Sequence, residues 1–118
     1  KLNADHLKIC LDTAHLFAAG YNLSEVSGRD RVINELKEYE LINRIGCIHL
    51  NESKAECASG RDLHENLGKG KIGSEGLKAF VNLKEISELP LLLEVPGDEE
   101  GDSNGPNLEQ IKIAKSWM

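Results

Sequence analysis

Six side chains of types that commonly bind metal ions occur in three regions of the chain. Three are imidazoles and three are carboxylates, a nitrogen and oxygen donor set that suits zinc, and manganese or iron less decisively. They are Asp12, His15, His49, Asp62, His64 and Glu94. Because a tetrahedral zinc ion takes at most four ligands, the set predicts more than one metal ion if all these side chains bind.

Taken one at a time, these residues have ordinary structural explanations. Asp12 has the spacing of a helix cap, and His15 suits a capping or core histidine. Asp62 and His64, the D-x-H pair, could be ordinary exposed loop residues. His49 and Glu94 are different, because each interrupts an apolar run in which an unpaired polar group would be costly. The residues together therefore favour a metal site.

Three short apolar runs predict the buried strands of a parallel sheet. The runs are LKICLD (7–12), IGCIHL (45–50) and LPLLLEV (89–95). In parallel α/β folds, active-site residues gather at the carboxyl ends of the strands. Asp12, His49 and Glu94 lie at these ends. We therefore expect the metal-binding side chains to converge at one face of the sheet.

Apolar residues at helical spacing lie between the predicted strands. Helices are expected within GRDRVINELKEYELI (28–42) and SEGLKAFVNLKEI (74–86), the second with Ser74 as its cap. A last helix is expected after Asn107, with Gln110 placed as in a capping box. Strands that alternate with helices predict an α/β fold with right-handed crossovers. Three such units make an incomplete domain.

The composition indicates a globular, acidic chain of 118 residues with a net charge of −6. This charge argues against a simple basic patch that holds nucleic acid by counterion release. A cluster of metal ions would supply local positive charge and allow a phosphate to bind. No apolar run approaches the roughly 18 residues of a membrane helix, so no membrane partner is expected. The first residue is Lys rather than Met, which suggests an excerpt of a longer protein.

Three cysteines without a C-x-x-C pair predict a reducing, intracellular compartment, cytoplasmic or nuclear, and no disulfides. Cys10 and Cys47 lie in apolar runs, where we expect small buried hydrophobic side chains. The G-x-G-x-x-G match GKGKIG (68–73) follows a polar loop rather than a strand, so a loop-shaping role is expected. DEEGDSNGPNLE (98–109) predicts a solvated acidic loop rather than a calcium site.

Two motifs closely resemble the hallmarks of endonuclease IV, the zinc-dependent apurinic/apyrimidinic endonuclease family 2. The first is KICLDTAH followed by LFAAGYNL, and the second is HLNESK followed after seven residues by DLHENLGKGKIG. The run LLLEVPG resembles the family's last strand. The resemblance implies a (β/α)8 TIM barrel of roughly 250 residues. Residues 1–118 would be its C-terminal part, matching the last three βα units.

The resemblance implies a DNA repair endonuclease of the base excision pathway. Its substrate would be double-stranded DNA, with the phosphodiester hydrolysed 5′ to an abasic site at a trinuclear zinc centre. The products would carry a 3′-hydroxyl and a 5′-deoxyribose phosphate. The implied zinc ligands are His15, Asp62 and His64 for one ion, and Asp12, His49 and Glu94 for a second and for catalysis. Manganese is an alternative metal.

A bridging glutamate and two further histidines of the family come from earlier strands, which this chain lacks. We therefore expect the chain alone to be inactive and to need the N-terminal part of the barrel as a partner. Many relatives carry an arginine where Leu63 stands. Arg61 or Lys54 is expected to contact DNA in its place.

The sequence is also compatible with two functions from other classes. A sugar isomerase or epimerase on a related barrel would also use strand-end carboxylates and histidines, with manganese or magnesium. Such sites favour oxygen ligands, whereas three histidines favour the nuclease. A non-catalytic fragment is the other reading. The unpaired edges of a partial barrel would then promote homo-oligomerisation.

Overall fold

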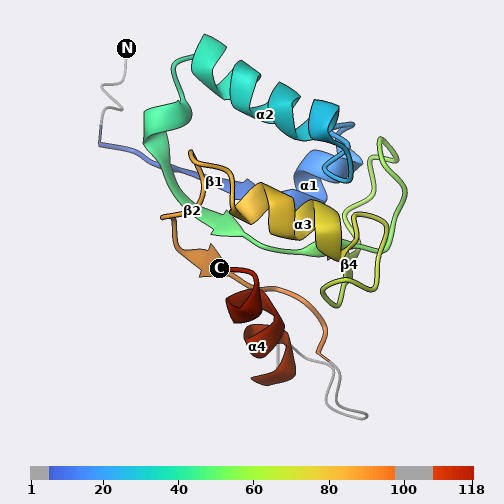
Figure 1. Cartoon of the computed structure of the whole chain (residues 1–118). Helices are drawn as coiled ribbons and strands as arrows, with labels where there is room; N and C mark the ends of the chain where they lie inside the picture. The colour runs from blue at the N-terminus through green and yellow to red at the C-terminus, as the bar shows by residue number, and fades with distance from the viewer. Residues whose placement is uncertain (1–5, 98–107) are drawn as a thin grey trace.

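A three-stranded parallel sheet forms the centre of the computed structural model, which describes residues 6–97 and 108–118. Its strands are β1 (Ile9–Asp12), β2 (Ile45–His49) and β5 (Leu91–Leu92), in the order β1-β2-β5. Both pairings are parallel, which confirms the predicted strands and their direction (Figure 1). The sheet has two open edges in the described residues, at β1 and at β5.

Four α-helices accompany the sheet in the described part of the chain. They are α1 (Thr13–Ala18), α2 (Val26–Glu38), α3 (Ser74–Val81) and α4 (Leu108–Ser116), and a 3₁₀ turn, η1 (Ile42–Arg44), precedes β2. The three predicted helices are confirmed, while α1 occupies a segment expected to be a loop. None of these helices is long and apolar enough to cross a membrane.

The predicted cap of α3 is wrong. Ser74 is the first residue of the helix, and the cap position belongs to Gly73, which makes no side-chain capping bond. Gly73 has φ = 86°, a conformation that favours glycine, and its N–H donates to the Glu52 carboxylate at 2.9 Å. Asn107 and most of the acidic loop lie outside the described residues. Gln110 is fully buried and accepts a hydrogen bond from the Leu67 N–H at 2.8 Å.

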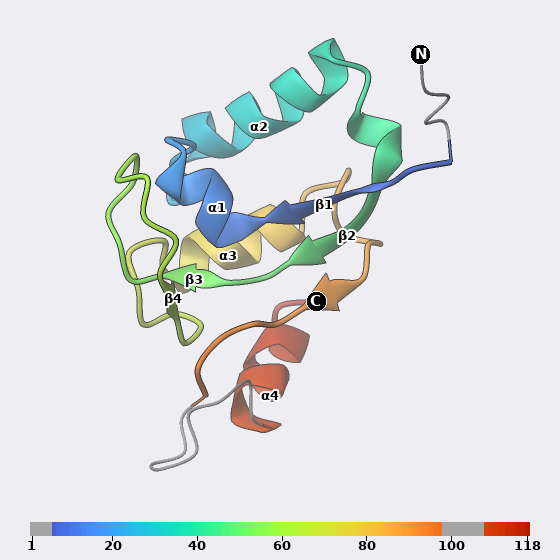
Figure 2. The same cartoon turned by 180° about the vertical axis from the view of Figure 1, so that it is seen from behind.

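One face of the sheet packs against α3 and the hydrophobic core. Ile48 of β2 and Phe80 of α3 are fully buried there. The other face is visible in front in Figure 2, with α3 behind the strands. Cys10 is exposed and Cys47 half-buried on that other face, so the prediction that both are buried hydrophobic residues is wrong. Side chains alternate along a strand, and these two point away from the helix that covers the sheet.

The long loop after β2 contains a short antiparallel pair, β3 (Glu52–Ser53) and β4 (His64–Glu65), which was not predicted. The Lys71 N–H donates to the Ser53 carbonyl at 2.7 Å. Gly70 lies so close that an added Cβ would be 2.3 Å from the same carbonyl oxygen. The glycine-rich segment thus wraps around β3, consistent with a loop-shaping role.

The carboxylate of Glu52 anchors this loop from inside. Glu52 is fully buried, and its oxygens accept from the N–H groups of Ser53, Ile72 and Gly73 at 3.0, 2.8 and 2.9 Å. A buried carboxylate is stable only when such donors surround it. The anchor joins β3 to the start of α3 and so fixes both ends of the loop.

The variant Glu52→Gln tests this anchor. The substitution removes the charge and turns one accepting oxygen into an NH₂ group that faces backbone donors. Because hydrogen bonds to charged groups contribute about 1.5–3 kcal/mol, we expect the free energy of unfolding to fall by about 2 kcal/mol. Urea unfolding followed by circular dichroism measures the change.

Glu88→Gln is the matched control, since Glu88 is exposed. Its free energy of unfolding should stay close to that of the unmodified chain. An unchanged Glu52→Gln variant, or an equal loss in both variants, would contradict the anchoring role.

Candidate metal centre

The six predicted metal-binding side chains meet at the carboxyl end of the sheet and touch one another in sequence. Asp12 ends β1, His15 lies in α1 and His49 ends β2. Asp62 lies in the loop before β4, and His64 is the first residue of β4. Glu94 lies in the segment after β5. In order of contact they are Glu94, His49, Asp12, His15, Asp62 and His64. The predicted convergence is therefore present.

The first group of donors contains Asp12, His49 and Glu94. His49 Nδ1 contacts Glu94 Oε1 and lies 3.7 Å from Asp12 Oδ2. One donor atom from each of the three lies within 4.8 Å of the others. The structure thus brings together the residues that the resemblance assigns to a single zinc. The Asp12 side chain is 10% exposed and the Glu94 side chain 51%, so the group reaches from the protein interior to solvent.

The second group differs in one member from the expected set. His15 Nε2 and His64 Nε2 each lie 3.1 Å from a different oxygen of Asp62. The donor atoms that lie within 4.8 Å of one another belong to Asp12, His15 and Asp62. The other ring nitrogen of His64 is 2.9 Å from the backbone carbonyl of Glu94. Asp12 therefore lies between both groups, and His64 contacts the second group through Asp62.

Backbone contacts hold the loop against α1 and bring Asp62 to His15. The N–H groups of Ala58 and Gly60 each donate at 3.0 Å to the last turn of α1. The Lys54 N–H donates to the Leu63 carbonyl at 2.9 Å, beside the short β3-β4 pair. These hydrogen bonds reduce the conformational freedom of the long loop, so that Asp62 keeps a fixed position relative to His15.

Two buried polar residues that sequence reasoning missed support the site. Asn51 is fully buried, donates from Nδ2 to Asp12 Oδ2 at 3.0 Å and accepts from the Glu94 N–H at 2.8 Å. Thr13 Oγ1 donates to the Asn51 carbonyl at 2.6 Å and accepts from the Asn51 N–H at 2.8 Å. Thr13 and Asn51 lie beside candidate ligands in the D-T-x-H and H-x-N motifs, and this position in the sequence could have indicated their role.

Asp12 also caps α1, as its spacing alone suggested. Its Oδ1 accepts from the His15 N–H at 3.0 Å, while Oδ2 accepts from Asn51. Both oxygens are therefore oriented before any ion arrives. Oriented carboxylate and imidazole donors at these separations fit a metal ion.

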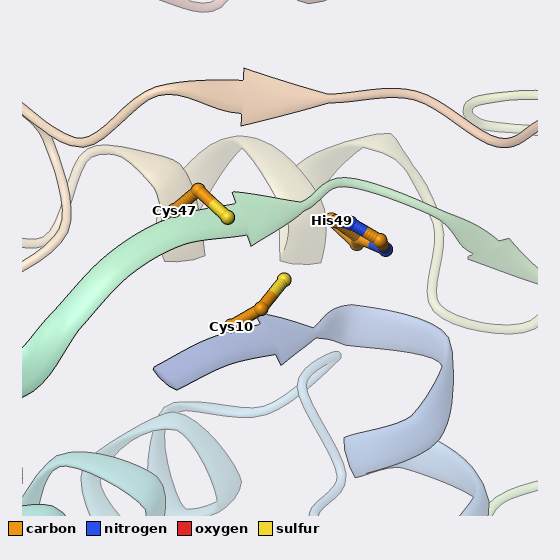
Figure 3. Close-up of side chains that lie close together, drawn as sticks. All are labelled: Cys10, Cys47 and His49. Carbon is orange, nitrogen blue, oxygen red and sulfur yellow. The ribbon is translucent and has the colours of Figure 1, made fainter. Parts of the chain in front are cut away.

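A sulfur-containing group lies next to the first set of donors. Donor atoms of Cys10, Cys47 and His49 also lie within 4.8 Å of one another (Figure 3). Desolvation of the thiol by neighbouring protein atoms, and secondly the neighbouring Cys47 thiol, raise the pKa of Cys10 to about 11. Cys10 is therefore a neutral thiol at neutral pH in the metal-free chain.

The residues predicted to contact DNA lie on the surface of the loop. Lys54 and Arg61 are both exposed, and Leu63 is 37% exposed between the candidate ligands Asp62 and His64. His6, at the other end of β1, is exposed as well.

A family model described as a xylose isomerase-like TIM barrel matches residues 1–118. "Probable endonuclease 4" of Haloarcula marismortui is 44% identical over 106 residues, which are 90% of this chain and 38% of that protein. "Probable endonuclease 4" of Thermosipho africanus is 44% identical over 96 residues, which are 81% of this chain and 34% of that protein.

The crystal structure of endonuclease IV from Thermus thermophilus matches with a TM-score of 0.75 and 30% identity. The match covers 94% of this chain and 38% of that structure. The resemblance to endonuclease IV indicated by the motifs is thereby confirmed, and the chain spans well under half the length of these relatives. The chain belongs to the xylose isomerase-like TIM barrel family.

Proposed function

We propose that residues 1–118 are the C-terminal part of a single TIM-barrel domain of a DNA repair endonuclease. The whole enzyme hydrolyses the phosphodiester 5′ to abasic sites in double-stranded DNA. The observation that carries the proposal is the unbroken series of contacts from Glu94 through His49 and Asp12 to His15 and Asp62. These residues occupy the positions of the endonuclease IV motifs.

Zinc is the metal that these donors suit best, with manganese second. Asp12, His49 and Glu94 would hold one ion, and His15 and Asp62 would hold another, with His64 or Asp12 completing the set. Zinc, when bound, supplies positive charge for the phosphodiester and acidifies the attacking water. The donors of this chain, which come from the ends of β1 and β2, from α1, from the loop after β2 and from the segment after β5, would account for part of a centre of up to three ions.

The chain's own residues orient this centre and position the substrate. Asn51 holds the Asp12 carboxylate and the backbone at Glu94 in place, so that the Asp12 carboxylate is oriented before an ion binds. Lys54 and Arg61 project from the same loop and would contact the phosphate backbone of DNA. Leu63 offers an apolar surface there, suited to pack against a sugar rather than to bind a phosphate.

The remaining strands of the barrel are the chain's first partner. β1 and β5 have unpaired edges in the described residues, and a closed barrel pairs every strand. Leu92 is 48% exposed on β5, as expected of a strand that lacks its neighbour. The three histidines among the donors support the nuclease over a sugar isomerase, whose sites favour oxygen ligands.

Metal analysis of the purified chain is the direct test. After dialysis against zinc, we expect at least about one zinc ion per chain by elemental mass spectrometry. Glu94→Gln should weaken zinc binding by roughly tenfold or more, because the amide removes a charged ligand. Glu75→Gln is the control, since Glu75 is exposed at the start of α3. Preference for magnesium, or equal affinities in both variants, would contradict the assignment.

Asn51→Ala tests the supporting hydrogen bonds. Loss of the bonds to Asp12 and to the Glu94 backbone should weaken zinc affinity by roughly 10–100-fold, as measured by competition with a chromogenic chelator. Asn82→Ala removes bonds to Lys78 and Trp117, away from the site, and should leave affinity unchanged. A drop of the same size in Asn82→Ala would mean that general destabilisation, rather than positioning, sets the affinity.

Complementation tests the activity of the whole enzyme. The chain alone should not incise a duplex with a single abasic site, since ligands from earlier strands are missing. Addition of the N-terminal part of the Thermosipho africanus relative should restore incision, and His49→Ala in this chain should abolish the rescue. A folded complex that retains its metals and still fails to incise would overturn the proposed activity.

A further inference from the structure

Two cysteine sulfurs and one imidazole lie together on the face of the sheet that α3 leaves uncovered. Cys10 and Cys47 are paired residues in the β1-β2 register, as are Asp12 and His49 further along the same strands. Figure 3 shows both sulfurs inclined toward the carboxyl ends of the strands, where His49 lies. Their donor atoms lie within 4.8 Å of one another, a separation that a single bound ion can bridge.

In the described residues, the hydrophobic core does not include this pair. Cys10 is exposed and Cys47 half-buried, and the hydrophobic core lies on the opposite side of the strands. The third cysteine, Cys57, packs against the core from the loop and lies outside the group. Two cysteines, which lose their protons when they bind a metal ion, and an imidazole differ from the carboxylate-rich set beside them, because sulfur selects soft, thiophilic cations.

We propose that Cys10, Cys47 and His49 form a second metal site for a thiophilic d¹⁰ cation, such as Cd²⁺, Cu⁺ or Zn²⁺. The two strands hold the ligands in register, and a water or a residue from outside the chain completes the coordination. The site uses His49, which also contacts Asp12 and Glu94. A soft ion bound here therefore competes with the carboxylate group for one imidazole.

The existence of the sulfur site does not depend on the proposed nuclease function, whereas its competition for His49 does. In the complete enzyme, a soft ion at this site would remove His49 from the set proposed for catalysis and act as an inhibitor. The barrel interior, rather than the DNA-facing surface, would then be where such an ion binds, because Cys10 and Cys47 precede the ligands along their strands.

Cadmium titration of the reduced chain tests the site. The thiolate-to-cadmium absorption band in the ultraviolet should appear and saturate at about one Cd²⁺ per chain, since one such ion takes both sulfurs. The double variant Cys10→Ser/Cys47→Ser should lose the band, and Cys57→Ser, the matched control, should keep it. Glu94→Gln should also keep it, which separates this site from the carboxylate group.

A band that survives in the double variant, or that disappears in Cys57→Ser, would overturn the proposal. Cadmium-113 NMR of the unmodified chain gives a test that needs no variant. A resonance in the range of mixed sulfur and nitrogen coordination supports the site, and one in the range of oxygen ligands alone contradicts it. If Glu94→Gln binds cadmium normally but binds zinc more weakly, the result supports both sites. If the chain shows the cadmium band but prefers magnesium to zinc, the result contradicts only the proposed function.

Discussion

The parallel register of β1 and β2 is the constraint on which the site depends. It sets Asp12 opposite His49 and, two residues earlier in each strand, Cys10 opposite Cys47. Because side chains alternate between the two faces of a strand, all four point away from α3. A shift of one residue in either strand would turn its ligand into the hydrophobic core. The same ladder therefore orders both the carboxylate group and the sulfur group.

Buried polar residues fix the orientation of the donor groups at the strand ends. Thr13 and Asn51 are both fully buried and satisfy each other's backbone and side-chain groups, so that Asn51 can hold Asp12 and the Glu94 backbone. Glu52, the next residue, plays a comparable part for the loop. Adjacent residues of one segment thus stabilise the strand ends and the loop that carries the candidate ligands Asp62 and His64.

Several elements could be predicted because their signals are local. The three strands are continuous apolar runs, and α2 and α3 have apolar residues at helical spacing. Other features depend on contacts between distant segments. The helix α1 is only six residues long, and β3 and β4 have two residues each, too short for any periodicity. Ser74 is of a residue type that often caps helices, but it is the first helical residue here. The N–H of Gly73, at the cap position, donates to the carboxylate of Glu52.

The α/β class, the direction of the strands and the identity of the candidate ligands could all be predicted from the sequence. Residue type and spacing carry that information, because motif chemistry and strand periodicity are local properties. The sequence did not reveal that Asp12 lies between two donor groups, that Asn51 holds Asp12 and the Glu94 backbone, or that Cys10 and Cys47 face away from the core. Those outcomes depend on the register and on which face of the sheet the helix covers, and both arise from packing between segments far apart in the chain.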